Sequence, residues 1–396
     1  MKARGAVAYA VALVAFLCAG LWLGGHPTTL PEFIREPFVG SPAALTAEAA
    51  ETIEDTYFRP VGETELGNAS LQGMVRGLRQ RYNDRFSEYF SPESLESFNE
   101  AIEGRFSGVG LSIVEVERGL RVVQVFAGSP AERAGIAPGD TLVSVDGESI
   151  AGVSSTEATT RIKGPEGTEV TLGVLDARSR KVRRLRLTRA EVTLPNVSSR
   201  VEKVDGRELG YVRMLSFSEG AHAQLAEGVR AARRQGAEGI VLDLRGNPGG
   251  LLDEAVLCAS LFLPEGRVVV STESRSQGDS VHRTVDARIT RLPLAILIDR
   301  GTASAAEILA AALADNAGAP VVGTRSFGKG VFQQEEPLAN GGALKLTVGE
   351  YFTPDGVNLA RTHGIHPDVK AADDPETAAD EGEERALGVL AGRLGG

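Results

Sequence analysis

The stretch Gly239-Ile-Val-Leu-Asp-Leu-Arg-Gly-Asn-Pro-Gly-Gly250 decides the fold of the longest region of the chain. Its apolar run, bounded by turn residues, predicts a strand buried within a sheet. The Pro-Gly-Gly turn ends that strand, and residues 251–262 have the apolar pattern of the helix that follows. Gly249 and Gly250 leave the backbone bare at this turn. The turn is therefore either a plain helix entry or a place where N–H groups approach a reacting carbonyl.

The same strand–helix pattern recurs downstream. Leu294–Ile298 is a second apolar run, residues 303–314 follow it with a helical pattern, and Val321 begins a third unit. Repeated strand–helix–strand units predict a largely parallel sheet covered by helices. We therefore expect an α/β domain over residues 190–370, followed by an acidic tail over residues 371–396 with room for a short final helix.

A compact β-rich module precedes this domain, over residues 104–189. Short alternating strands are separated there by turns such as Ala137-Pro-Gly-Asp140 and Gly164-Pro-Glu-Gly167. The module ends in a strongly basic segment, residues 178–189. Such a segment is typical of a solvated edge strand protected from aggregation.

The N-terminal part of the chain is first apolar and then helical. Residues 6–25 carry no charge over a length that spans a bilayer as a helix, and the basic residues before them favour a cytoplasmic N-terminus. We expect an uncleaved membrane anchor over residues 1–25, with a cleaved signal peptide as the alternative. Residues 26–43 are a proline-containing linker, and residues 44–103 form a small helical region.

Composition limits the classes of function. The chain has 396 residues, with 42 Lys or Arg and 53 Asp or Glu, so its formal net charge is −11. An acidic chain without a basic block argues against nucleic acid as a partner. Cys18 and Cys258 lie in apolar segments and argue against a disulfide framework. His363 and His366 lack further ligands at zinc spacing, so we expect no metal and no other cofactor.

Two segments of the β-rich module point to peptide binding. Phe106-Ser-Gly-Val-Gly-Leu111 places two glycines before a strand, a turn whose N–H groups can hold a carboxylate. The stretch Gly128-Ser-Pro-Ala-Glu-Arg-Ala-Gly-Ile-Ala-Pro-Gly-Asp-Thr-Leu-Val-Ser-Val-Asp-Gly147 resembles the hallmark of PDZ domains. In that family a peptide C-terminus adds as a strand beside one loop, although some members are structural spacers. The loop corresponds here to Gly108, Val109, Gly110 and Leu111.

A serine and a lysine lie in two turns of the α/β domain. Ser304 opens a helix whose N-terminal N–H groups can stabilise an oxyanion, although Ser304 with Glu307 also forms the pattern of an ordinary capping box. Lys329 lies 25 residues later, between two glycines. Burial would lower the pKa of such a lysine and make it a base for the serine. Gln333 can orient its amine; a phosphate site at Lys329 is the weaker alternative.

Taken in order, these segments resemble the C-terminal processing peptidases, also called tail-specific proteases. The likeness rests on Asp243-Leu-Arg-Gly-Asn-Pro-Gly-Gly250, Gly301-Thr-Ala-Ser-Ala-Ala-Glu307 and Ser326-Phe-Gly-Lys-Gly330 followed by Gln333. It covers about residues 44–370. The resemblance implies a multidomain α+β protein whose α/β protease core is crotonase-like, as in ClpP.

The resemblance also assigns roles within that core. It makes Ser304 the nucleophile, Lys329 the general base and Gln333 the residue that orients the base. It gives the oxyanion hole to the backbone N–H groups of Gly250 and Ala305. The implied activity is that of a serine-type endopeptidase.

Lys163 departs from the pattern of many relatives, which carry an arginine at this place. In some relatives that arginine couples the PDZ domain to the protease core. Lysine lacks the planar fork of arginine, so we expect weaker coupling here.

The resemblance implies processing or degradation of proteins from their C-terminal region, outside the cytoplasmic membrane of a bacterial cell. The PDZ domain would recognise substrate C-termini and gate activity, and the N-terminal helix would hold the chain on the inner membrane with the catalytic part in the periplasm. A homo-oligomer or an adaptor protein stays open. The alternatives are a PDZ scaffold with an inactive protease core and a crotonase-like acyl-CoA enzyme.

Overall fold

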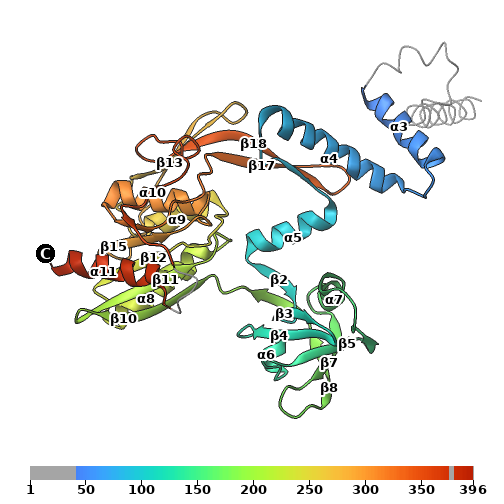
Figure 1. Cartoon of the computed structure of the whole chain (residues 1–396), viewed down its shortest axis with the longest axis horizontal. Coiled ribbons are helices and arrows are strands. Elements are labelled where there is room, and N and C mark those ends of the chain that lie inside the picture. Colours follow the sequence, from blue (N-terminus) through green and yellow to red (C-terminus); the bar gives the residue numbers. More distant parts are fainter. Residues whose placement is uncertain (1–41, 374–378, 396) are drawn as a thin grey trace, which may run out of the picture. The chain divides into compact units, whose positions relative to one another are not determined.

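The computed structural model describes residues 42–373 and 379–395 (Figure 1). The expected membrane anchor and nearly all of the linker lie outside these residues. Within them, no helix combines the length and the apolar character that crossing a bilayer requires. The chain divides into two units, one of residues up to Pro92 with 335–346, and one of residues 93–334 with 347–396.

The first unit joins helices to the tip of a β-hairpin. Its elements are α3 (Pro42–Thr56), α4 (Glu63–Tyr82), β1 (Glu88–Phe90) and the adjoining ends of β17 (Val331–Pro337) and β18 (Ala343–Phe352). The Tyr89 hydroxyl donates to Asn68 Oδ1 at 2.7 Å and accepts from Asn340 Nδ2 at 2.8 Å, which ties α4 to the hairpin. The first turn of α4 carries Glu63 and Glu65, acidic residues that favour a helix N-terminus.

The β-rich module is a small sheet with its own core, in the second unit. Its elements are β3 (Leu111–Val116), β4 (Gly119–Val125), α6 (Pro130–Arg133), β5 (Thr141–Val145), β6 (Glu148–Ser149), α7 (Ser155–Ile162), β7 (Glu169–Leu175) and β8 (Val182–Thr188). The strand order is β3-β4-β5-β7-β8, with β6 on β5. The basic strand β8 thus lies at an edge, as its charge predicts. Leu120, Leu142 and Leu172 are fully buried in the core.

Two short segments join this module to the next domain. α5 (Pro92–Glu103) leads into β2 (Arg105–Gly108), which pairs antiparallel with β9 (Ala190–Thr193). At its far end α5 contacts the following domain, where the Glu219 N–H donates to the Ile102 carbonyl at 2.9 Å.

The α/β domain is built on a six-stranded sheet of order β10-β11-β12-β15-β16-β19. Its elements are β10 (Val197–Val204), β11 (Arg207–Met214), α8 (Ala221–Arg234), β12 (Gly239–Asp243), α9 (Leu252–Ser260), β13 (Val268–Ser274), β14 (Ser280–Arg283), β15 (Leu294–Ile298), α10 (Ala305–Ala317), β16 (Val321–Gly323), β19 (Val369–Lys370) and α11 (Glu381–Gly395). The pairs from β11 to β19 are parallel, as predicted, and β10 adds an antiparallel edge. Outside this sheet, β13 pairs with β14 and with β18.

Alternate residues of the central strands face two different cores. Ile240, Leu242 and Ile296 pack in one apolar cluster with α8, α9 and α10. Val241 and Leu297 pack in another with α11. The sheet is therefore covered on both faces, which explains why its central strands are apolar throughout.

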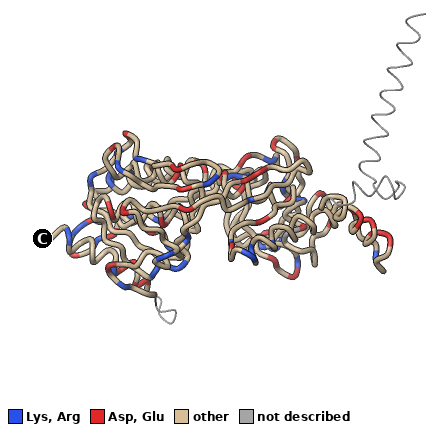
Figure 2. The backbone as a smooth tube through the Cα atoms, turned by 90° about the horizontal axis from the view of Figure 1, so that it is seen from above, with Lys and Arg blue, Asp and Glu red and all other residues tan. Residues whose placement is uncertain are grey.

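The C-terminal segment is a packed helix rather than only an acidic tail with a short helix. Residues 381–395 form α11, and Ala386, Leu387 and Leu390 are buried against the sheet. Acidic residues at the start of this helix dominate the composition of the segment and mask the spacing of its apolar residues. Acidic and basic residues are interleaved along the described chain rather than gathered in one block (Figure 2).

Candidate active site

Ser304 lies at the turn between β15 and α10, where it precedes the first helical residue. Its backbone has φ 55° and ψ −121°, a conformation that non-glycine residues rarely adopt. The Glu307 carboxylate accepts the Ser304 N–H at 3.0 Å, which helps to hold this turn. Strain of this kind concentrates at functional sites, and a sharp strand-to-helix turn is how α/β-hydrolases expose a nucleophilic serine.

The glycine turn at residues 246–250 packs directly against the serine turn. The Asn247 carbonyl accepts the Ala303 N–H at 2.9 Å. A Cβ added at Gly249 would come within 2.8 Å of both Ser304 Cβ and the Ala305 nitrogen. No side chain other than hydrogen fits there, so the glycine permits the close approach of the two turns.

At this junction, the backbone N–H groups of Gly250 and Ala305 take no part in the hydrogen bonds of the neighbouring bridge and helix. Gly250 forms a parallel bridge with Phe217. The Gly249 carbonyl and the Leu251 N–H make the two hydrogen bonds of this bridge, so the Gly250 N–H takes no part in it. Ala305 is the first residue of α10, so its N–H has no partner one turn earlier in the helix. The structure places both predicted oxyanion donors on turns that contact each other.

Lys329 and Gln333 are in contact, as their spacing predicts. Lys329 Nζ donates to Gln333 Oε1 at 2.7 Å. Gln333 Nε2 in turn donates to Thr347 Oγ1 at 3.3 Å, which bridges β17 to β18. Lys329 itself precedes β17, and the hydroxyl of the buried Tyr351 donates to its carbonyl. The lysine therefore has a fixed backbone and an oriented amine.

Glu307 connects the serine turn to the lysine turn, and sequence reasoning missed this role. A single oxygen, Oε2, accepts the N–H of Ser304 and the N–H of Lys329, each at 3.0 Å. The other oxygen accepts the Gly328 N–H at 2.7 Å and the Ser326 hydroxyl. Burial raises the pKa of Glu307, and these hydrogen bonds oppose that shift. A carboxylate with no exposed surface in an alanine-rich helix was the available signal.

A second buried network fixes the start of the glycine turn. Asp243, at the end of β12, accepts from the Tyr211 hydroxyl at 2.5 Å and from Arg245 Nη2 at 3.0 Å. Arg245 also donates to Asp373 at 2.9 Å and to Asp380 at 2.7 Å. Burial and the Asp243 charge raise the pKa of Tyr211 well above its usual range. The segment around α11 thus holds the strand end from which the glycine turn departs.

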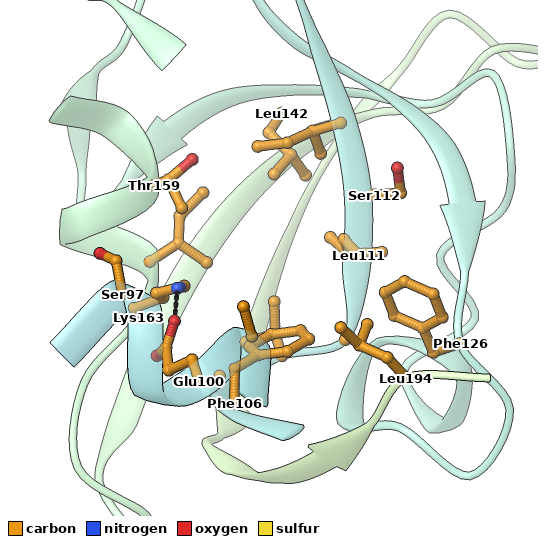
Figure 3. A pocket seen from close by; sticks show the side chains of 16 residues that line it. Ser97, Glu100, Phe106, Leu111, Ser112, Phe126, Leu142, Thr159, Lys163 and Leu194 are labelled. Atoms are coloured by element: carbon orange, nitrogen blue, oxygen red, sulfur yellow. Dashed lines mark hydrogen bonds and ion pairs between the residues drawn. The ribbon is translucent and has the colours of Figure 1, made fainter. Parts of the chain in front are cut away.

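The predicted peptide loop lines a cavity of about 350 Å³ in the β-rich module (Figure 3). Gly110 has φ +83°, and a Cβ there would come within 2.2 Å of Ser129 Cβ. The cavity is mainly apolar; its lining includes Val109, Leu111, Ile113, Phe126, Leu142 and Ile162. Lys163, for which the sequence predicts coupling of this module to the protease core, forms an ion pair with Glu100 of α5.

The remaining candidates have ordinary surroundings. Cys258 is a buried free thiol whose pKa burial raises well above its usual range. The ring of His366 lies 3.1 Å from the Thr362 carbonyl. In the described ranges 42–373 and 379–395, no cluster of His, Cys, Asp and Glu is placed to hold a metal ion.

Comparison with known proteins agrees with both domains. The PDZ domain family matches residues 100–175, and peptidase family S41 matches residues 208–371. The carboxy-terminal processing protease CtpA of Bacillus subtilis is 34% identical over 324 residues, which cover 82% of this chain and 68% of that protein. A probable CtpA-like serine protease of Staphylococcus aureus is 36% identical over 319 residues, 80% of this chain and 62% of the relative. This chain therefore spans a little less than two thirds of the staphylococcal protein.

The same comparison extends to solved structures. A photosystem II D1 C-terminal processing protease has 29% sequence identity and a TM-score of 0.49, covering 89% of this chain and 92% of that one.

Proposed function

Because this chain belongs to peptidase family S41 and its relatives are carboxy-terminal processing proteases, we propose that it is an endopeptidase that cleaves proteins near their C-terminal end by a serine–lysine mechanism. The observation that carries the proposal is the Glu307 carboxylate, which binds the backbone of both Ser304 and Lys329 through one oxygen. A capping box alone would involve Ser304 but would give Glu307 no reason to hold the lysine turn.

The proposed reaction begins with proton transfer. Lys329, as the neutral amine, takes the Ser304 hydroxyl proton while the serine oxygen attacks the scissile carbonyl carbon. Gln333 Oε1 accepts one Lys329 N–H and so directs the amine. The N–H groups of Gly250 and Ala305 stabilise the oxyanion, each by roughly 3 kcal/mol of barrier. The C–N bond then breaks and Lys329 returns the proton to the leaving amine.

The second half of the reaction restores the enzyme. Water attacks the acyl-serine, and Lys329 takes its proton as the base. The same two backbone donors stabilise the second oxyanion. The acyl C–O bond breaks, the serine oxygen recovers the proton, and the shortened substrate leaves with a new C-terminal carboxylate.

Substrate selection belongs to the PDZ domain in this proposal. The apolar cavity beside residues 108–111 suits a peptide end with small apolar side chains, which adds as a strand to the sheet edge at β3. Membrane anchoring through residues 6–25 would place the enzyme in the periplasm or on the outer surface. Gating by the PDZ domain, and assembly with further copies or an adaptor, belong to the same proposal.

Replacement of the serine tests the mechanism. Wild type and Ser304→Ala are incubated with an unfolded protein that ends in apolar residues, and cleavage sites are identified by mass spectrometry. We expect cleavage near the substrate C-terminus by wild type and none by Ser304→Ala. Equal cleavage by both would remove Ser304 from the chemistry. Binding of the tail without cleavage by wild type would favour the scaffold alternative.

A further inference from the structure

The mouth of the PDZ cavity holds a charge pair that the sequence motifs do not explain. Glu100 Oε2 lies in contact with Lys163 Nζ, and both residues line the cavity (Figure 3). Glu100 comes from α5, ahead of the sheet strands, whereas Lys163 follows α7 directly. The pair therefore joins two elements across one rim of the cavity.

Lys163 stands beside the loop proposed to receive a peptide carboxylate. Its Cγ lies 3.9 Å from where a Cβ on Gly108 would be. Its ammonium lies 5.5 Å from the centre of the Phe106 ring, whose apolar surface keeps water from one side. A cation at this place would attract the C-terminal carboxylate of any peptide that enters the cavity.

Glu100 presents a carboxylate to that same cation. Its side chain is 25% exposed and that of Lys163 is 36% exposed, so the pair is partly screened by water and can separate without leaving a fully buried charge. An entering peptide offers an equivalent carboxylate together with apolar contacts that Glu100 lacks. The two carboxylates would compete for one ammonium.

We propose that Glu100 is an internal competitor of the peptide ligand: its carboxylate occupies Lys163 in the free protein, and the C-terminal carboxylate of a substrate replaces it. This inference rests on the proposed function, because it requires that the cavity bind a peptide end. The affinity for a substrate then depends on how much more strongly its carboxylate binds Lys163 than the Glu100 carboxylate does. α5 is released from the rim when the substrate binds.

Peptide binding to the full chain tests the competition. All proteins carry Ser304→Ala so that the probe is not cleaved, and the probe is a short fluorescent peptide ending in Ala-Val with a free carboxylate. Fluorescence anisotropy gives the dissociation constant. We expect Glu100→Gln to bind the probe about two- to fivefold more tightly, the range that a partly exposed ion pair supplies.

Two controls separate competition from general charge effects. Glu96→Gln makes the same charge change on an exposed residue one turn earlier in α5 and should leave affinity unchanged. In a Lys163→Met background, Glu100→Gln should bring no gain, because the shared cation is gone. The amidated form of the probe should also gain nothing from Glu100→Gln.

The outcomes distinguish this inference from the function on which it rests. Probe binding that is equal in wild type and Glu100→Gln, or a gain that persists without Lys163, would overturn the competition while leaving PDZ recognition intact. A probe that binds no variant would overturn both. Tighter binding by Glu100→Gln, seen only with Lys163 and a free carboxylate, supports the proposal.

Discussion

At the residue scale, the geometry of the proposed active site depends on backbone positions that few residues tolerate. Ser304 adopts positive φ without being glycine, and Gly249 leaves room for the serine turn to approach. Conformations of this kind cost about 1–3 kcal/mol and persist only where the surroundings impose them. Here the Asn247 and Glu307 hydrogen bonds supply that constraint.

Replacement of Gly249 by alanine should disrupt both stability and activity. The residue has φ +95°, and the new Cβ would come within 2.7 Å of the Ala303 carbonyl. Gly246→Ala is the matched control, because Gly246 has φ +67° but no heavy atom within 4 Å of an added Cβ. We expect Gly246→Ala to cost about 1 kcal/mol of unfolding free energy from strain alone.

Gly249→Ala should lower kcat/KM by at least about tenfold more than Gly246→Ala, because it separates the two turns that carry the proposed oxyanion donors. Steady-state cleavage and urea unfolding measure the two effects. Equal losses in the two variants would show that contact between the turns does not matter.

Glu307 should give the protein a distinctive pH dependence. Burial raises its pKa in the folded state above the usual 4.5, so the folded protein binds this proton more tightly than the unfolded chain does. Its contribution to stability is full below the unfolded pKa and is lost as pH rises through the folded pKa. Glu307→Gln has no such proton.

We therefore expect the stability difference, wild type minus Glu307→Gln, to decline as the pH rises above the ordinary glutamate pKa of 4.5. Urea unfolding at several pH values measures it. A constant or rising difference would contradict the raised pKa. We also expect Glu307→Gln to lower kcat with little change in KM, because a glutamine amide cannot accept from four donors as the carboxylate does.

At the element scale, α11 is part of the folded domain. It packs on the face of the central sheet opposite α8, α9 and α10, and Arg245 fastens its first turn to the end of β12. The same strand end leads into the glycine turn. The last helix of the chain therefore supports the site from behind the sheet, although it contributes no residue to the chemistry.

Leu390→Ala tests the contribution of this helix. Leu390 is fully buried and lies against Gly239 at the start of β12. Removing its side chain should cost about 3 kcal/mol of unfolding free energy, from lost apolar burial and the cavity left behind. Leu394→Ala, at a partly exposed place on the same helix, should cost less than about half as much. Comparable losses would mean that α11 is not a specific part of the core.

At the scale of the whole molecule, function is divided between parts with separate cores. The PDZ sheet and the protease sheet each have their own apolar cluster, and α5 contacts both through Glu100 and Ile102. Acidic and basic positions are interleaved along much of the described backbone (Figure 2).

Local sequence predicted much of this arrangement. What it missed depends on packing between parts of the chain that are distant in sequence. The strands at 239–243 and 294–298, the helix after Ser304 and the basic edge strand follow from periodicity and turn residues, which act over a few positions. The Lys329–Gln333 contact follows from a four-residue spacing. By contrast, the sequence indicated only a short helix within an acidic tail, and the packing of α11 against the sheet depends on tertiary structure.

The sequence by itself determined the two domain types, the alternation of strands and helices in the α/β domain from residue 239 onward and the candidate residues, because these depend on short motifs and local propensities. The tertiary structure alone decided which distant residues meet. Only folding brings Glu307 to the lysine turn 22 residues away, Arg245 to Asp380, and Glu100 to Lys163. The physical reason is that buried or partly buried polar groups must find partners wherever the packing of helices and strands leaves them, and no local pattern encodes that choice.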